Sequence, residues 1–357
     1  MSGDPGTSSG GAPGLADQYR AARSAAVVAD RGDVEVLFVR GRDAADLLHR
    51  LTTNAIRGLG EGQGAATVFT TAKGRILDLV TVHRTGAGFL LLCAAGRGQP
   101  VRDWIERYTF REQVTVEEGS ATHGVFGLCG ARSGALVHDL WGLADLPLHG
   151  VTPIGSAAHA GLLIRSWPLG GEGYLVVAPL AALAALRAAA TGAGVKGAVE
   201  GAREVVEAGT ACLEILRVEA GLPAAGRELT EEHNPWEARL QDAISLDKGC
   251  YVGQEVIARL NTYDKVARFL VRLSAAHAPA PPPSSGPPEE AQAFPPGAAI
   301  RDGAPIGAVT SSVFVPDGAG RALALGYVRD EDATPGHAVE IVWAGGEAPA
   351  TILGVAR

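Results

Sequence analysis

The chain has 357 residues, a net charge of −8 and a sequence pI near 5.6. This acidic balance argues against a large nucleic-acid footprint, which usually needs a basic patch, and no run of about 18 or more apolar residues is present to span a membrane. The content of 46% hydrophobic and 20% charged residues is typical of a globular protein with a substantial core. At roughly 100–200 residues per domain, we expect two or three domains.

The first residues, 1–14, are mainly Gly, Ser and Pro, and they lack the cationic start and apolar run of a secretory signal. We therefore expect a disordered tail and a cytoplasmic protein. The four cysteines are widely spaced, without a Cys-x-x-Cys pair, so neither a zinc site nor a four-cysteine cluster is predicted. Disulfides are not expected in the cytosol. Cys93, Cys129 and Cys212 lie in apolar segments and are predicted to be core residues.

Periodic apolar patterns predict alternating strands and helices in the first third of the chain. In chain order, the predicted elements are a strand at 34–39, a helix at 44–51, strands near 66–71 and 75–83, a strand at 89–93 and a helix around 101–108. Lys73-Gly74 separates two of these strands and predicts a hairpin turn. Strands and helices mixed in this order predict an α+β layer domain.

A faint internal repeat follows. The segments 36–51 and 125–140 both read as strand, glycine and amphipathic helix, and Gly41, Leu47, His49 and Leu51 match Gly130, Leu136, His138 and Leu140 at a constant spacing. Chance similarity between two supersecondary units is the alternative. If the repeat is real, it marks a second α+β domain that starts near residue 121 and includes a strand at 174–177 and a helix at 180–191.

The C-terminal part reads as short strands separated by turns. Residues 278–297 are rich in Pro, Ser, Glu and Ala, and such a segment buries too little apolar surface to order itself, so we expect a mobile insertion. The short strands resume at 299–300, 307–313, 322–328 and 338–343. This spacing predicts a small sheet or barrel.

The most informative segment is Lys248-Gly249-Cys250-Tyr251-Val252-Gly253-Gln254-Glu255. Glycines at 249 and 253 permit close backbone approach or positive φ. Residues 254–260 have helical spacing, so Cys250 is expected just before a helix N-terminus. A helix N-terminus and a neighbouring ammonium both favour a thiolate, and this pattern predicts a reactive cysteine assisted by Lys248. The alternative is a small buried hydrophobic residue.

This octapeptide resembles the K-G-C-[FY]-x-G-Q-E signature of the YgfZ-type folate-binding proteins, which are relatives of the glycine-cleavage T-protein. Besides Lys248 and Cys250, the residues of this motif are Gly249, Tyr251, Gly253, Gln254 and Glu255. Further segments resemble the R-x-E-x-G…G-x-E-L, P-x-E-x-x-L, T-x-N, G-x-V-T-S and A-L-G-Y-V patterns of the superfamily, and they lie at 217–229, 234–240, 51–54, 307–311 and 324–328. The likeness covers roughly 14–353, apart from the proline-rich insertion.

The resemblance implies an α+β fold with three domains in a cloverleaf around a central hole that holds tetrahydrofolate or a one-carbon derivative. The expected folate-binding domain is 15–120 completed by 205–265. The second α+β domain is expected at 121–204, and a small β-barrel at 266–357.

The resemblance also nominates residues for folate. Glu219 stands where T-proteins place a carboxylate against the pterin ring, and a carboxylate accepts two N–H bonds from that edge. Arg217 and Arg227 are expected to orient Glu219 or to meet the glutamate tail of folate; the alternative is that they are solvated surface charges. Asn54 and Trp236 are expected to line the same pocket; their alternatives are a helix cap and a core residue.

Asp78 matches one aspartate of the T-protein pattern G-G-x-x-D-D, which sits near N5 of folate. In this chain Leu79 replaces the second aspartate and Arg75 replaces a glycine, which puts aminomethyl transfer in doubt. A lone aspartate beside a hairpin is also a common turn residue.

The resulting hypothesis is an accessory protein for assembly or repair of iron–sulfur clusters, which uses bound tetrahydrofolate and the Cys250 thiol. Its implied partners are folate and iron–sulfur cluster proteins or assembly factors, without nucleic acid or membrane. The cluster role is implied by the resemblance alone. One alternative is a folate-dependent aminomethyl or one-carbon transferase of T-protein type. Another is a folate-binding interaction module in which Cys250 is structural.

Overall fold

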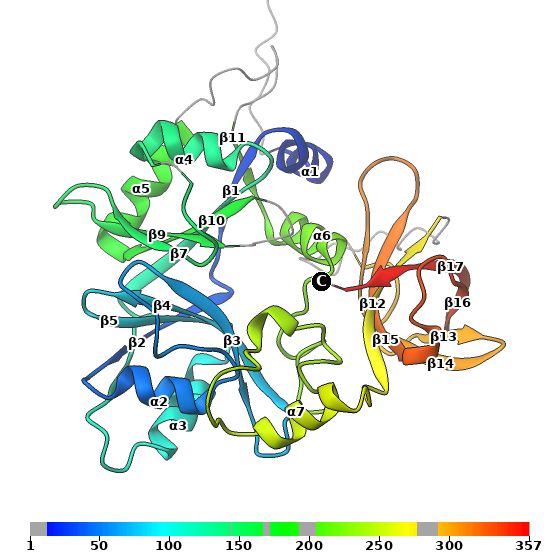
Figure 1. Cartoon of the computed structure of the whole chain (residues 1–357). Helices are drawn as coiled ribbons and strands as arrows, with labels where there is room; N and C mark the ends of the chain where they lie inside the picture. Colours follow the sequence, from blue (N-terminus) through cyan, green and yellow to red (C-terminus); the bar gives the residue numbers. More distant parts are fainter. Residues whose placement is uncertain (1–12, 144, 167–171, 193–204, 277–291, 357) are drawn as a thin grey trace, which may run out of the picture.

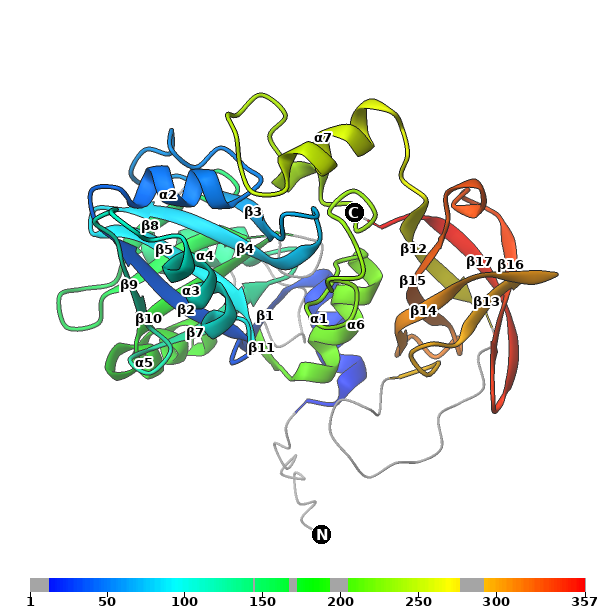
Figure 2. The same cartoon turned by 90° about the horizontal axis from the view of Figure 1, so that it is seen from below.

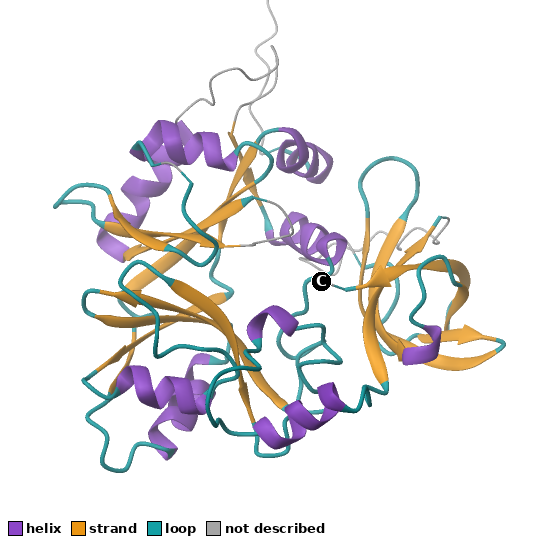
Figure 3. Ribbon diagram, in the orientation of Figure 1, coloured by secondary structure: helices purple, strands orange, loops and turns teal. Residues whose placement is uncertain are grey.

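The computed structural model describes residues 13–143, 145–166, 172–192, 205–276 and 292–356. Most of the expected N-terminal tail and residues 278–291 of the expected insertion lie outside these ranges. The described chain forms an antiparallel five-stranded β-sheet and a mixed six-stranded β-sheet, both flanked by helices, and a closed six-stranded barrel (Figures 1 and 3). The predicted α+β fold with a C-terminal barrel is therefore confirmed.

The five-stranded sheet is antiparallel, with strand order β3-β4-β5-β2-β6. Its strands and helices are β2 (Val34–Arg40), α2 (Ala44–Leu51), β3 (Gly64–Thr70), β4 (Ile76–Thr85), β5 (Gly88–Ala94), α3 (Gly98–Arg107) and β6 (Thr115–Glu118). Both helices are amphipathic, and Leu47, Leu48 and Val101 pack with Val80 and Val82 of β4 in one buried cluster. The helices therefore cover one face of this sheet.

The six-stranded sheet has the order β11-β1-β7-β10-β9-β8. Its elements are β1 (Ala26–Asp30), β7 (His123–Cys129), α4 (Ser133–Trp141), β8 (Val151–Ile154), β9 (Gly161–Ser166), β10 (Gly173–Pro179), α5 (Leu180–Gly192) and β11 (Val205–Ala208). The expected division had placed β1 and β11 with the five-stranded sheet, but strand pairing places both here. The reason is that β1 is buried on both faces from Ala26 to Ala29, as suits an inner strand. Val36, Leu92, Val125 and Val177 belong to one apolar cluster that joins the two sheets.

The suspected repeat corresponds to two equivalent units, β2–α2 and β7–α4. The linking glycines have nearly the same positive φ, 119° at Gly41 and 118° at Gly130. A Cβ at Gly41 would lie 1.9 Å from the carbonyl oxygen of Gln113. Only glycine therefore fits this turn, which explains its recurrence in both units.

The closed barrel has the order β12-β15-β14-β13-β16-β17. Its strands are β12 (Arg268–Ala275), β13 (Ala299–Asp302), β14 (Ala304–Phe314), β15 (Ala322–Arg329), β16 (Ala338–Trp343) and β17 (Gly346–Val355). Phe294 is 1% exposed and packs in the barrel core, and its N–H donates to Ser312 Oγ at 2.7 Å. The end of the expected insertion, 292–297, is thus part of the barrel, because its phenylalanine supplies the apolar surface that the rest of the segment lacks.

The helices α1 (Leu15–Ser24) and α6 (Thr210–Ala220) lie between the sheets and the barrel, and α7 (Gln254–Thr262) precedes the barrel (Figure 2). One buried cluster contains Ile76 of β4, Ile215 of α6 and Leu270 of β12. The five-stranded sheet, α6 and the barrel therefore share a hydrophobic core. Among the described helices, none is long and apolar enough to cross a membrane.

Candidate functional site

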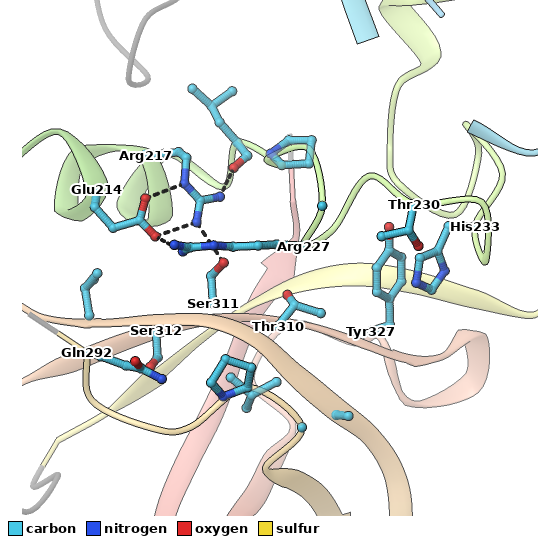
Figure 4. A pocket seen from close by; sticks show the side chains of 18 of the residues that line it. Glu214, Arg217, Arg227, Thr230, His233, Gln292, Thr310, Ser311, Ser312 and Tyr327 are labelled. Carbon is cyan, nitrogen blue, oxygen red and sulfur yellow. Dashed lines mark hydrogen bonds and ion pairs between the residues drawn. The ribbon is translucent and has the colours of Figure 1, made fainter. Parts of the chain in front are cut away.

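A cavity of about 1660 Å³ lies between the six-stranded sheet, α6, the loop 222–233 and the barrel strands β14 and β15 (Figure 4). Its volume exceeds the roughly 300–1,000 Å³ that is usual for small-molecule sites. The wall combines arginine and glutamate side chains with aromatic rings. This cavity is the candidate ligand site.

Arg217 on α6 is the centre of the polar wall. Its guanidinium donates to both oxygens of Glu214, at 2.7 and 2.8 Å, and to Ser311 Oγ of β14 at 2.7 Å. Burial raises the pKa of Glu214, but the hydrogen bond and the charge of Arg217, with a smaller contribution from Arg227, hold that pKa below its ordinary value. The pair is therefore ionised at neutral pH, and the bond from Arg217 to Ser311 fixes α6 to the barrel.

Glu228 extends this network. Its side chain is fully buried, and its carboxylate accepts hydrogen bonds from the Ser311 hydroxyl at 2.6 Å, the Ala224 N–H at 2.8 Å and Arg217 at 3.1 Å. A buried carboxylate with three donors is satisfied, whereas removal of one partner would leave the others buried and unpaired. Glu228 thus ties the loop 222–233 to both α6 and β14.

An aromatic surface forms another part of the wall. The rings of His233 and Tyr327 are stacked, with centroids 3.6 Å apart and an interplanar angle of 12° (Figure 4). The Tyr327 hydroxyl donates to the Glu228 carbonyl at 2.9 Å, and burial raises the pKa of Tyr327. Both rings are therefore held in place by the same loop.

Of the residues nominated for folate, Arg217 and Arg227 line this cavity. The Arg227 side chain is 51% exposed and contacts Glu214 at 2.5 Å. Glu219 is not part of the described wall. Its carboxylate accepts a hydrogen bond from the Tyr19 hydroxyl at 3.0 Å and lies 3.4 Å from Arg23, so it ties α6 to α1.

Asn54 and Trp236 are also absent from the described wall of the cavity. The Asn54 amide donates to the Ala66 carbonyl at 2.8 Å and holds the turn after α2. The Trp236 indole N–H donates to the Ile257 carbonyl at 2.9 Å and fastens α7.

Asp78 of β4 is buried and is not among the described residues that line the cavity. It is 1% exposed, and within the described chain neither carboxylate oxygen has a hydrogen-bond partner of normal geometry. Burial raises the pKa of Asp78 to about 7, although Arg97 and the nearby backbone N–H groups of Leu79 and Ala94 oppose the rise. Leu79, where T-proteins have a second aspartate, packs instead against the core shared by the five-stranded sheet, α6 and the barrel.

The loop that carries the cysteine motif lies against the end of α2. Lys248 is 8% exposed, and its ammonium donates to the carbonyl oxygens of His49, Thr52 and Asn54. Tyr251 is buried, and Gln254 and Glu255 begin α7, as predicted. Gly253 precedes the helix with a φ of 85°, and a Cβ there would lie 2.6 Å from the Thr71 carbonyl oxygen.

Cys250 is exposed, whereas the other three cysteines are buried in the core, as predicted. Burial raises the pKa of Cys129 to about 11 and that of Cys212 to about 12, and it also raises the pKa of Cys93. Beyond its two chain neighbours, no heavy atom of the described residues lies within 4 Å of a Cβ added at Gly249. Of these four thiols, that of Cys250 is the one open to a partner or reagent.

The residues that the sequence interpretation missed are Glu214, Glu228, Ser311 and Tyr327. Three of them lie in segments with recognisable family patterns: Glu228 belongs to G-R-E-L, Ser311 to G-A-V-T-S and Tyr327 to A-L-G-Y-V. Those patterns located the segments without showing that their side chains meet. Among the described residues, no group of three or more His, Cys, Asp or Glu is placed to hold a metal ion.

Comparison with known proteins gives relatives over most of the chain. Residues 8–248 match the GCVT N-terminal domain, and residues 287–355 match the glycine cleavage T-protein C-terminal barrel domain. A chloroplastic protein of Arabidopsis thaliana, named as a candidate transferase, is 31% identical over 329 residues, 88% of this chain and 68% of the relative. An aminomethyltransferase of Streptomyces avermitilis is 28% identical over 328 residues, 90% of this chain and 83% of the relative.

The fold is similar to a solved structure as well. The glycine cleavage system aminomethyltransferase T from Bartonella henselae superposes with a TM-score of 0.78 at 22% identity, covering 95% of this chain and 88% of that chain. Its likeness extends across both sheets and the barrel. Together with the two domain matches, it leads to one conclusion: the chain belongs to the glycine cleavage T-protein family.

Proposed function

We propose that this protein is a YgfZ-type member of the family, which binds tetrahydrofolate or a one-carbon derivative and supports assembly or repair of iron–sulfur clusters in the cytoplasm. Its partners in this proposal are iron–sulfur cluster proteins or assembly factors. The observation that carries the proposal is the exposed Cys250 in the K-G-C-Y-V-G-Q-E loop, since the other three cysteines are buried.

The cavity suits a flat ligand with an anionic tail. Arg227 keeps half of its side chain exposed at the wall, where a guanidinium pairs well with a carboxylate. The His233–Tyr327 stack offers a planar surface beside it. When bound, tetrahydrofolate supplies a carrier for one-carbon groups, and the wall residues hold and orient it.

Two of the nominated carboxylates do not fit this cavity. Glu219 is engaged by Tyr19, Asp78 is buried in β4, and neither is among the described residues of the cavity wall. We therefore assign the ligand's anionic end to Arg227 and leave Asp78 and Glu219 out of the site.

The test combines two measurements on matched variants. Cys250→Ser is expected to keep its fold and its calorimetric affinity for tetrahydrofolate, because the cysteine is not a wall residue, while cells that carry it lose activity of their iron–sulfur enzymes. Arg227→Ala should weaken tetrahydrofolate binding by about 1.5–3 kcal/mol, whereas Arg102→Ala, a change on α3 away from the cavity, should leave it unaltered. Full cluster-enzyme activity with Cys250→Ser would refute the role of the thiol.

A folate-dependent aminomethyltransferase is the second candidate. It is favoured by the similarity to aminomethyltransferases across most of the chain. It is opposed by Leu79, because this residue removes a carboxylate from the T-protein pattern. A glycine-cleavage assay with the lipoyl carrier protein distinguishes the two: turnover that survives Cys250→Ser would establish the transferase and displace the accessory role.

A further inference from the structure

The loop that presents Cys250 is fastened on both sides of the cysteine. On one side, the Thr53 hydroxyl donates to the Ala243 carbonyl at 2.6 Å. On the other side, the Val252 N–H donates to the Arg50 carbonyl at 3.1 Å, and the Thr70 hydroxyl donates to the Val252 carbonyl at 2.7 Å. Gly249 and Cys250 are exposed between these points. The thiol is thus presented from a held segment.

Lys248 makes the largest set of these contacts. Its ammonium has three N–H donors, and three backbone carbonyls accept them, those of His49, Thr52 at 2.5 Å and Asn54 at 2.8 Å. These carbonyls belong to the end of α2 and the turn after it, where carbonyl groups lack helical partners and a positive charge is favourable. Lys248 therefore completes the end of α2 from a position almost two hundred residues away in the chain.

This geometry leaves the ammonium no N–H to direct at Cys250. The Nζ atom also lies 4.9 Å from the centre of the Tyr251 ring, a cation–π contact. Burial, and then the charge of Arg57, lower the pKa of Lys248 to about 7. The three carbonyl acceptors favour the charged form, because a neutral amine has only two N–H groups for three acceptors.

We propose that Lys248 is a positioning residue, which fastens the loop 248–253 to the end of α2 so that the Cys250 thiol is presented in one place, and that it does not exchange a proton with that thiol. The inference rests on the proposed function, in which Cys250 is the working thiol. It replaces the activating role that proximity in the sequence suggests.

The first arm of the test separates position from charge. Lys248→Met removes the charge and all three hydrogen bonds, and Lys248→Gln removes the charge but keeps two N–H donors. Thr70→Val removes a separate fastening of the same loop without any change in charge. Lys73→Met is the matched control, because Lys73 is exposed on the hairpin that packs against α7.

Hydrogen exchange measures the fastening directly. Lys248→Met and Thr70→Val should speed amide exchange at Val252 and Gly253 by at least about tenfold, while amides of the barrel keep their rates. Lys248→Gln should show a smaller increase, and Lys73→Met none. Unchanged exchange at Val252 and Gly253 in Lys248→Met would overturn the proposal.

Alkylation of Cys250 by iodoacetamide across pH 6–10 measures activation. If Lys248 only positions the loop, the midpoint of this pH profile is the same in all four variants as in the unchanged protein. If Lys248 activates the thiol, its removal raises the midpoint equally in Lys248→Met and Lys248→Gln, whereas Thr70→Val leaves the midpoint unaltered. That second pattern would also overturn the proposal. If Lys248→Met does not fold, the alkylation profile of Lys248→Gln distinguishes the two roles.

Iron–sulfur enzyme activity in cells then links position to function. Lys248→Met and Thr70→Val should lower it toward the level of Cys250→Ser, and Lys73→Met should not. If Cys250→Ser itself retains full activity, the proposed function fails, while exchange and the alkylation profile still decide the role of Lys248. If only Cys250→Ser loses activity, the contacts of Lys248 and Thr70 are not needed for function. The positioning role of Lys248 is then refuted, while the proposed function stands.

Discussion

Asp78 combines almost complete burial with a pKa raised to about 7. Arg97 faces this carboxyl favourably, whereas Glu35 faces it with a like charge, and the Cys93 thiol lies beside it. Because the folded state holds the proton more tightly than the unfolded chain, the stability from this proton is complete below about pH 4 and is lost as the pH rises through 7.

Asp78→Asn should remove that dependence. We expect the free energy of unfolding of the variant, relative to the natural protein, to increase by roughly 2–3 kcal/mol between pH 5 and pH 8. Urea unfolding at the two pH values measures this difference, in which other titrating groups cancel. Parallel pH dependence in the two proteins would mean that the Asp78 carboxyl is ionised and paired in the folded state.

At the scale of elements, the buried Glu228 joins α6, the loop 222–233 and β14. Glu228→Ala leaves Arg217 and Ser311 without one partner in a buried setting, so we expect a loss of about 3–5 kcal/mol in the free energy of unfolding. Glu231→Ala, an exposed change in the same loop, should cost less than about 0.5 kcal/mol. Chemical denaturation of both variants tests this, and equal stabilities would show that the network is not a junction.

The elements also show how far local patterns reach. Apolar spacing predicted α2, α3, α7 and the barrel strands β13 to β16, because each has one face buried by its neighbours. The patterns gave no sign of α1 or of the β1–β11 pairing, which depend on contacts between distant segments. Glu219 contacts Tyr19, which lies 200 residues away in the chain. Because side chains alternate along a strand, Asp78 lies on the face of β4 opposite to that of its neighbour Leu79. Contacts between residues far apart in the chain depend on tertiary packing, and no local sequence pattern indicates them.

At the scale of the whole molecule, the insertion before β13 divides into two parts. Deletion of 278–291 should change the melting temperature little, because the free energy of loop closure varies slowly with length. Phe294→Ala should cost about 3–5 kcal/mol, since it empties a fully buried site in the barrel. Thermal unfolding of the two variants provides the comparison. A large effect of the deletion with a small effect of Phe294→Ala would contradict it.

The pairing of β1 with β11 has a consequence for synthesis on the ribosome. β1 emerges early, yet the strand that covers its outer edge begins at Val205. The ribosome needs roughly 10–35 s to add the intervening residues at the usual rates. Throughout that time a strand whose residues Ala26 to Ala29 all end up buried has an open edge, and open apolar edges recruit other chains. Nascent chains halted before Val205 are therefore the form of this protein that most needs a chaperone.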